Sequence, residues 1–140
     1  MFDLNTIVSA LATGVPVLIG HILLAMVLFA AGVRIHIAIT PIDEPRLVAA
    51  GNTAAGIALS GAILGMAIPL AATLATSKSA LDIVLWGIVA LIVQLALYAV
   101  ASLTVRGLRG LVEAGNVAVG TVLAAAQIGI AFLVAAALAV

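Results

Sequence analysis

Four long apolar segments constrain this chain more than any other feature of its sequence. They run from about Gly14 to Ile39, Leu47 to Thr76, Leu81 to Val105 and Val112 to Leu138. At about 1.5 Å per helical residue, each is long enough to cross a hydrocarbon core of about 30 Å. Barrel strands would alternate polar and apolar residues over about ten positions, which these segments do not do. The sequence therefore predicts an all-α membrane protein with four transmembrane helices.

Composition agrees with this prediction and excludes several classes of function. Hydrophobic residues make up 66% of the 140 residues and charged residues 7%, whereas about a quarter of a soluble domain is charged. The formal net charge is zero, so the chain lacks the basic field that attracts nucleic acid. It also has no cysteine, which excludes disulfides and thiolate chemistry.

The basic residues predict an orientation in the membrane. Arg34 and Arg46 lie around the first connection between segments, Arg106 and Arg109 lie in the third, and Lys78 is the basic residue of the second. Cytoplasmic connections carry the excess of Lys and Arg. We therefore expect the first and third connections in the cytoplasm, both termini in the periplasm, and a charged cytoplasmic rim of Arg34, Arg46, Arg106, Arg109 and Glu113.

An internal repeat is the most specific pattern in the chain. Residues 48–56, VAAGNTAAG, recur as VEAGNVAVG at 112–120, and the two copies are offset by 64 residues (115 − 51 = 64). The register continues without a gap, because Leu59 matches Leu123 and Gly65 matches Gly129. We expect a single membrane domain made of two tandem parallel-repeat helical hairpins. The first is 1–76, beginning with a short N-terminal interfacial segment, and the second is 77–140.

Several polar residues are expected inside the hydrocarbon. We place Asn52 and Asn116 one to two turns inside their helices, Gln94 and Gln127 inside the third and fourth spans, and His21 in the outer part of the first. Each must find a polar partner, because an unpaired polar group in lipid costs about 2 kcal/mol or more. They either line a polar pore or form hydrogen bonds between helices, and the sequence leaves both readings open.

Small residues at a four-residue spacing predict close helix packing. The glycines that we assign to packing are Gly51, Gly56, Gly61, Gly65, Gly115, Gly120 and Gly129. Four short apolar helices bury little surface between them, so we also expect a homo-oligomer. Whether the small faces pack within one chain or between copies stays open at this point.

The motif Glu113-Ala114-Gly115-Asn116 and its first copy Ala49-Ala50-Gly51-Asn52 carry a family resemblance. With the small residues that follow, the chain resembles the YjfL-like family of bacterial inner-membrane proteins, whose function is unknown. Ala49 departs from the motif, which has Glu at this position. The resemblance implies a four-helix protein of the bacterial inner membrane with links to membrane-stress or polyamine-related gene sets, and it implies no reaction.

The sequence favours transport or assembly over catalysis. It contains no recognised catalytic motif, and its acidic residues lie at the expected membrane edges, so no acid–base pair converges in the bilayer. His36, Asp43 and Glu44 are close in sequence, but the turn with Pro41 and Pro45 gives no defined metal-ligand spacing. We expect no enzyme activity, no cofactor and no metal site. The leading hypothesis is an oligomeric pore or transport path for an ion or small solute. The alternative is a non-catalytic scaffold that recruits a cytoplasmic stress-response partner.

Overall fold

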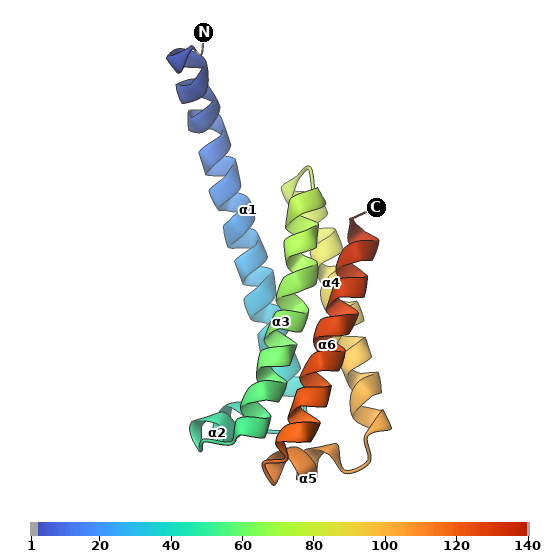
Figure 1. Ribbon diagram of the computed structural model, residues 1–140. Helices are drawn as coiled ribbons and strands as arrows, with labels where there is room; N and C mark the ends of the chain where they lie inside the picture. Colours follow the sequence, from blue (N-terminus) through green and yellow to red (C-terminus); the bar gives the residue numbers. More distant parts are fainter. Residues whose placement is uncertain (1–2, 140) are drawn as a thin grey trace.

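The computed structural model describes residues 3–139 and is entirely helical over them apart from short turns. Its four long helices are α1 (Leu4–Ile39), α3 (Thr53–Thr76), α4 (Ala80–Thr104) and α6 (Val117–Leu138) (Figure 1). Two short helices, α2 (Glu44–Ala49) and α5 (Leu108–Glu113), lie together at one end of the bundle (Figure 1). We call this the short-helix end, and the turn at residues 77–79 marks the opposite end.

Helices α3 and α6 form the centre of the bundle, and their close contact depends on glycines, which have no side chain to hold the two backbones apart. A Cβ on Gly120 would lie 2.5 Å from the carbonyl oxygen of Ala54, and a Cβ on Gly61 would overlap the Cα of Ala124. Glycine therefore allows the two backbones to touch, which provides the van der Waals contact that holds helices together in lipid. Helices α1 and α4 pack against α3 and against each other, with the side chain of Leu91 filling the space over Gly32.

The Gly-Asn motif stops one helix and starts the next. Gly51 and Gly115 follow α2 and α5 with φ values of 82° and 78°, a conformation that glycine adopts without strain. The N–H of Gly51 donates to Val48 O at 2.9 Å and that of Asn52 to Leu47 O at 2.9 Å, which is the Schellman pattern. The same two bonds recur at Gly115 and Asn116, at 2.9 and 3.0 Å.

This geometry corrects two predicted boundaries. The segments at 47–76 and 112–138 are each broken at the glycine, so the transmembrane helices start later than expected. Gly51 and Gly115 are turn residues rather than packing residues, and neither would place a Cβ within 4 Å of another group.

The first helix also differs from the prediction. α1 continues from Leu4 to Ile39 without a break at Pro16, so the described residues contain no separate interfacial helix before the first span. Phe2, part of that predicted segment, lies outside the described residues. The ring of Pro16 removes the helical donor to the Ala12 carbonyl, yet the chain stays helical on both sides of it. At about 1.5 Å per residue the helix is about 54 Å long, and its N-terminal half extends beyond the bundle (Figure 1).

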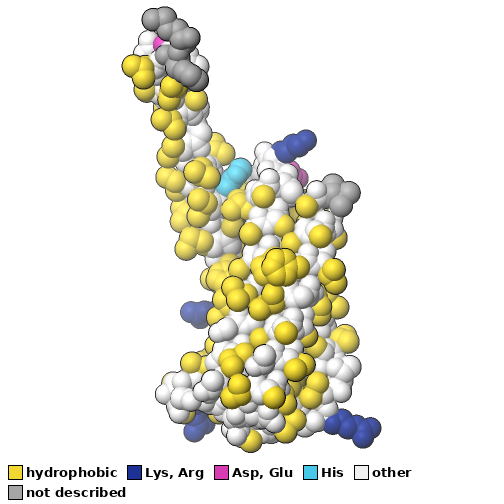
Figure 2. All heavy atoms as spheres, viewed as in Figure 1, with side chains coloured by type: hydrophobic (Ala, Val, Ile, Leu, Met, Phe, Trp, Pro, Cys, Tyr) yellow, Lys and Arg dark blue, Asp and Glu magenta, His cyan; other side chains and the backbone are white. Residues whose placement is uncertain are grey.

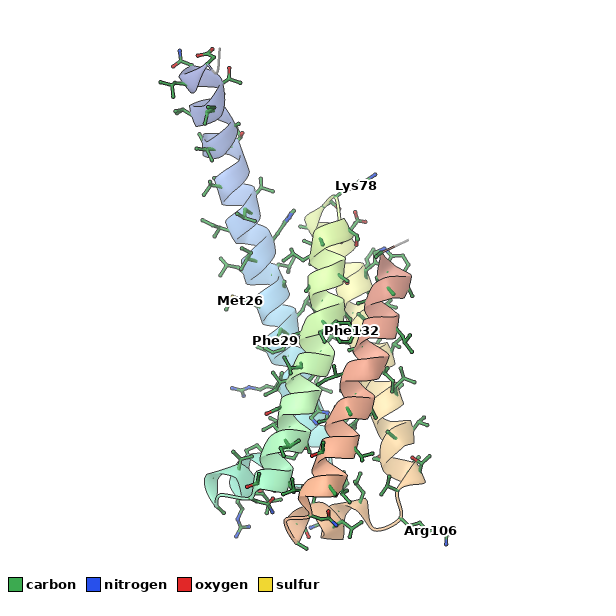
Figure 3. All side chains as sticks on the ribbon, viewed as in Figure 1. Met26, Phe29, Lys78, Arg106 and Phe132 are labelled. Carbon is green, nitrogen blue, oxygen red and sulfur yellow. The ribbon has the colours of Figure 1, made fainter. Side chains whose placement is uncertain are left out.

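The exterior confirms the all-α membrane class. Each of the four long helices has the length and hydropathy to cross a membrane. Figure 2 shows hydrophobic side chains along the visible face, interrupted by few charged ones. Lys78 and Arg106 lie at opposite ends of the bundle (Figure 3). The duplication of one hairpin remains a prediction.

Candidate functional site

A buried polar cluster lies just inside the short-helix end, where α1, α2 and α4 meet. His36 on α1 is 1% exposed and Glu44, the first residue of α2, is 0% exposed. His36 Nε2 lies 3.3 Å from Glu44 Oε2. Tyr98 on α4 packs edge-on against the His36 ring, with centroids 4.5 Å apart, and its buried hydroxyl lies near Thr40 and Glu44. The cluster therefore joins three titratable groups from three helices in the protein interior.

The cluster is poorly satisfied in hydrogen bonds. Both carboxylate oxygens of Glu44, Nε2 of His36 and the Tyr98 hydroxyl have no hydrogen-bond partner with good geometry among the described residues. Burying such groups without partners is expensive, and a buried charge is tolerated only when it is paired. Buried polar groups left in this state are candidates for binding an ion, a proton or water.

Local sequence explains how Glu44 enters the interior. Asp43 caps α2 by accepting the N–H of Arg46 at 3.3 Å, and Pro45 sits in the first turn, where its missing N–H is not needed. The chain therefore turns sharply after α1, and Glu44 points under the end of that helix. His36 and Glu44 are both visible in the sequence, with a proline-containing turn between them. Their spacing along the chain did not predict that this turn would bring the two side chains together.

A second polar layer lies one turn deeper. Gln94 precedes Tyr98 by one turn of α4, and its Nε2 donates to the backbone carbonyl of Gln127 on α6 at 3.1 Å. Both glutamines are nearly fully buried, and Gln94 Oε1 and Gln127 Nε2 have no partner among the described residues. Gly65 makes room for this layer, because a Cβ there would lie 2.6 Å from Gln94 Nε2. The structure thus brings together two of the five predicted intramembrane polar residues.

Beyond the glutamines the interior is apolar except for Thr73, whose buried hydroxyl donates to the Pro69 carbonyl at 3.0 Å. Ala62, Met66, Leu70 and Leu91 form a buried cluster, with Leu28, Phe29 and Val33 packed against it. On the outside of the bundle, Met26 on α1 and Phe132 on α6 are exposed apolar side chains (Figure 3). The polar layers therefore reach from the short-helix end to the glutamines and stop at an apolar barrier.

The two asparagines are capping residues, which corrects their predicted place inside the helices. Asn52 Oδ1 accepts the N–H of Ala55 at 3.0 Å, and Asn116 Oδ1 accepts that of Val119 at 3.2 Å. A glycine followed by asparagine is the sequence signal for a helix stop and a new N-cap. Because they cap the first turn, they lie at the edge of the bundle, not within a constriction.

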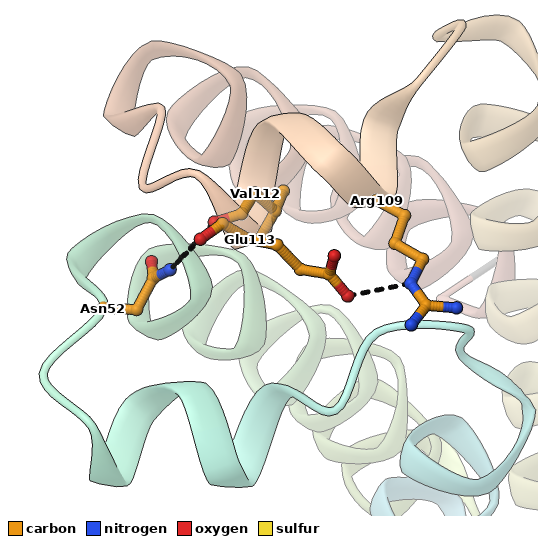
Figure 4. Close-up of polar contacts among 4 residues, drawn as sticks. All are labelled: Asn52, Arg109, Val112 and Glu113. Carbon is orange, nitrogen blue, oxygen red and sulfur yellow. Dashed lines mark hydrogen bonds and ion pairs between the residues drawn. The ribbon is translucent and has the colours of Figure 1, made fainter.

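Asn52 has a further role that Asn116 lacks. Its Nδ2 donates to the carbonyls of Val112 at 2.9 Å and Glu113 at 3.1 Å, so it ties α3 to the end of α5 (Figure 4). Asn116 is exposed, and its Nδ2 makes no hydrogen bond with a described residue. Of the two readings left open, the structure shows interhelical hydrogen bonding for Asn52.

The remaining predicted residues lie apart from the cluster. His21 is half-buried on α1, about four helical turns before His36. Arg34, Arg46 and Arg106 are exposed, and Arg109 pairs with Glu113 at 2.8 Å (Figure 4). Gly129 has no neighbouring atom where a Cβ would be, and Gly56 has only Val48, at 3.9 Å. Within residues 3–139 no group of three His, Cys, Asp or Glu side chains could hold a metal ion.

Comparison with known proteins identifies the family. The model of the DUF350 family, a domain of unknown function, matches residues 10–138. The chain belongs to this family. It is 37% identical over 86 residues to the UPF0719 inner membrane protein YjfL of Escherichia coli strain K12, and equally to that of E. coli O157:H7. The matched region is 61% of this chain and 65% of each relative, so it spans just under two thirds of the curated relatives.

No solved structure matches the chain. The relatives' location and the four apolar helices together make this an integral, multi-pass inner-membrane protein. The expected YjfL-like resemblance is thereby confirmed.

Proposed function

We propose that this protein provides a transport path for protons or a small cation, and that the path enters through the interior of the helical bundle at the short-helix end. The observation that carries the proposal is the buried pair of His36 and Glu44, with polar atoms that no described residue satisfies. Titratable groups inside membrane proteins are expensive and commonly mark ion or proton routes.

The order of the polar groups supports a route. Glu44 and His36 lie at the short-helix end, Tyr98 follows on α4, and Gln94 lies one turn deeper against Gln127. Imidazole, carboxylate, hydroxyl and carboxamide groups can pass a proton or hold a partly dehydrated cation. The apolar cluster around Met66 and Leu91 then acts as the barrier that transport must cross, by movement of α1 or α4 or by transient wetting. This route replaces the predicted pore lined by the two asparagines.

Flux into reconstituted liposomes tests the proposal. The full chain is compared with Glu44→Gln, which removes the buried charge, and with Glu113→Gln, which removes an exposed one. A voltage is imposed, and an internal pH dye reports proton flux while an internal cation-sensitive dye reports cation flux. We expect one of these fluxes above empty liposomes for the wild type and Glu113→Gln, and at least a tenfold loss for Glu44→Gln. Helical content and elution volume check that each variant is folded, and His36→Gln provides a second loss variant.

Flux that does not exceed empty liposomes at several voltages and pH values would overturn the proposal. Equal flux in folded Glu44→Gln and in the wild type would overturn the route.

An adaptor function remains the second candidate, on a separate observation. Arg46 on α2 and Arg106 at the short-helix end (Figure 3) are exposed, and neither has an acidic partner among residues 3–139. Such a rim offers a docking surface for an acidic cytoplasmic protein. Charge reversal at Arg46 and Arg106 would then abolish recovery of the partner without changing flux, whereas unchanged recovery would count against the adaptor.

A further inference from the structure

The contact between α3 and α6 joins unlike faces of the two repeated helices. Position 54 of α3 meets position 120 of α6, position 61 meets 124, and position 65 meets 127. Adding the repeat offset of 64 residues converts the α3 face into Ala118, Ala125 and Gly129 of α6. Subtracting it converts the α6 face into Gly56, Ser60 and Ile63 of α3. The α3 face in this contact has an equivalent on α6, and the α6 face has an equivalent on α3. Neither of these two equivalent faces takes part in the contact.

Both unused faces are open. Ala118, Ala125 and Gly129 are exposed on α6, and a Cβ on Gly129 would have no atom within 4 Å. On α3, Ser60 is exposed and Gly56 and Ile63 are only half-buried. A groove of about 610 Å³ runs along this α3 face, lined by these three residues among others, and the α6 face borders a hollow of about 360 Å³ that includes Ala118. Each chain thus presents both halves of a contact that it has already made once internally.

The hydrogen bonds of the two asparagines differ in the same way as the two helix faces. Asn52 donates through Nδ2 to the carbonyls of Val112 and Glu113, which belong to the other repeat. The equivalent carbonyls for Asn116 are those of Val48 and Ala49, both exposed residues at the short-helix end. Asn116 is exposed and its Nδ2 donates to no described residue of its own chain, so a second copy that repeats the internal contact would bring these carbonyls within its reach.

We infer that a second copy of this chain docks by repeating the internal contact, with the open α6 face of one copy in the α3 groove of the next. Because the two faces differ, the contact is heterologous, and repetition of it produces a ring or a row rather than a closed two-fold dimer. Ala125 stands where Gly61 stands in the internal contact, so the copies lie slightly farther apart at that level than α3 and α6 do. This inference is independent of transport, because a chain can assemble without conducting.

Disulfide crosslinking tests the contact directly, since the natural chain has no cysteine. One chain carries Ser60→Cys and a second, differently tagged chain carries Ala125→Cys, and the two are co-expressed and oxidised in native membranes. We expect a covalent heterodimer in the mixture at least fivefold above either chain alone. Val100→Cys, exposed on α4, replaces Ala125→Cys as the control and should give no product with Ser60→Cys.

Two further variants test the surfaces without disturbing the fold. Gly129→Leu fills open space in the single chain and should reduce the crosslink at least fivefold, whereas Gly20→Leu, equally open on α1, should not. Asn116→Asp keeps the capping oxygen but removes the Nδ2 donor, and should also reduce it. Absence of the heterodimer, an equal crosslink with Ala125→Cys alone, or an unchanged yield in Gly129→Leu would each overturn the inference.

Discussion

Removing one member of the buried pair formed by His36 and Glu44 should destabilise the protein strongly. The two side chains are 1% and 0% exposed, with 3.3 Å between Nε2 and Oε2. When both are charged, their attraction at this distance is about 5 kcal/mol for an effective dielectric constant of about 20. Most of this offsets the cost of burying the charges, but a single removal leaves the other group uncompensated. We expect Glu44→Leu or His36→Leu to lower the free energy of unfolding by about 3 kcal/mol.

A double-mutant cycle separates the pair from simple loss of packing. The double variant Glu44→Leu/His36→Leu removes both polar groups and leaves no uncompensated charge. Its decrease in the free energy of unfolding should therefore be smaller than the sum of the two single decreases by about 2 kcal/mol or more. The control is Glu113→Leu, which breaks an exposed pair with Arg109 whose side chains are 40% and 63% exposed. A pair of that kind contributes about 0.3–0.5 kcal/mol.

Reversible unfolding in mixed micelles, followed by circular dichroism, measures these differences. A coupling energy below about 0.5 kcal/mol would mean that the two residues act independently. If Glu44→Leu lowers the free energy of unfolding by no more than Glu113→Leu does, the argument from burial is refuted.

Three other outcomes follow from the structure. Gly120→Val should destabilise the fold by about 2 kcal/mol, measured by the same unfolding assay, because its side chain would separate α3 from α6. Asn52→Asp retains the cap but loses two interhelical bonds and should cost about 1–3 kcal/mol, whereas Asn116→Asp should be nearly neutral for the isolated chain; equal losses would contradict this. Single cysteines at Asp43 and Gly107 should react with a membrane-impermeant maleimide from the cytoplasmic side only, and labelling from opposite sides would refute the predicted orientation.

The sequence by itself determined the class of fold. Long uncharged segments in a nearly uncharged chain require helices surrounded by lipid, because the backbone in hydrocarbon must satisfy its own hydrogen bonds. The Gly-Asn motif was visible as well, but its interpretation was wrong. We took Asn52 for an intramembrane group, although glycine followed by asparagine also specifies a helix stop and a new cap.

Only the tertiary structure decided which residues meet. Hydrophobic periodicity is weak in a chain that is apolar on nearly every side, so the sequence could not say which face of α3 contacts α6. The pairing of Glu44 with His36 depends on a sharp turn between helices, and the contact of Gln94 with Gln127 depends on the register of two helices far apart in sequence. Close packing sets the register behind the second contact, through the side chains that Gly61, Gly65 and Gly120 lack, and helix registry of this kind is a property of the assembled bundle rather than of any single segment.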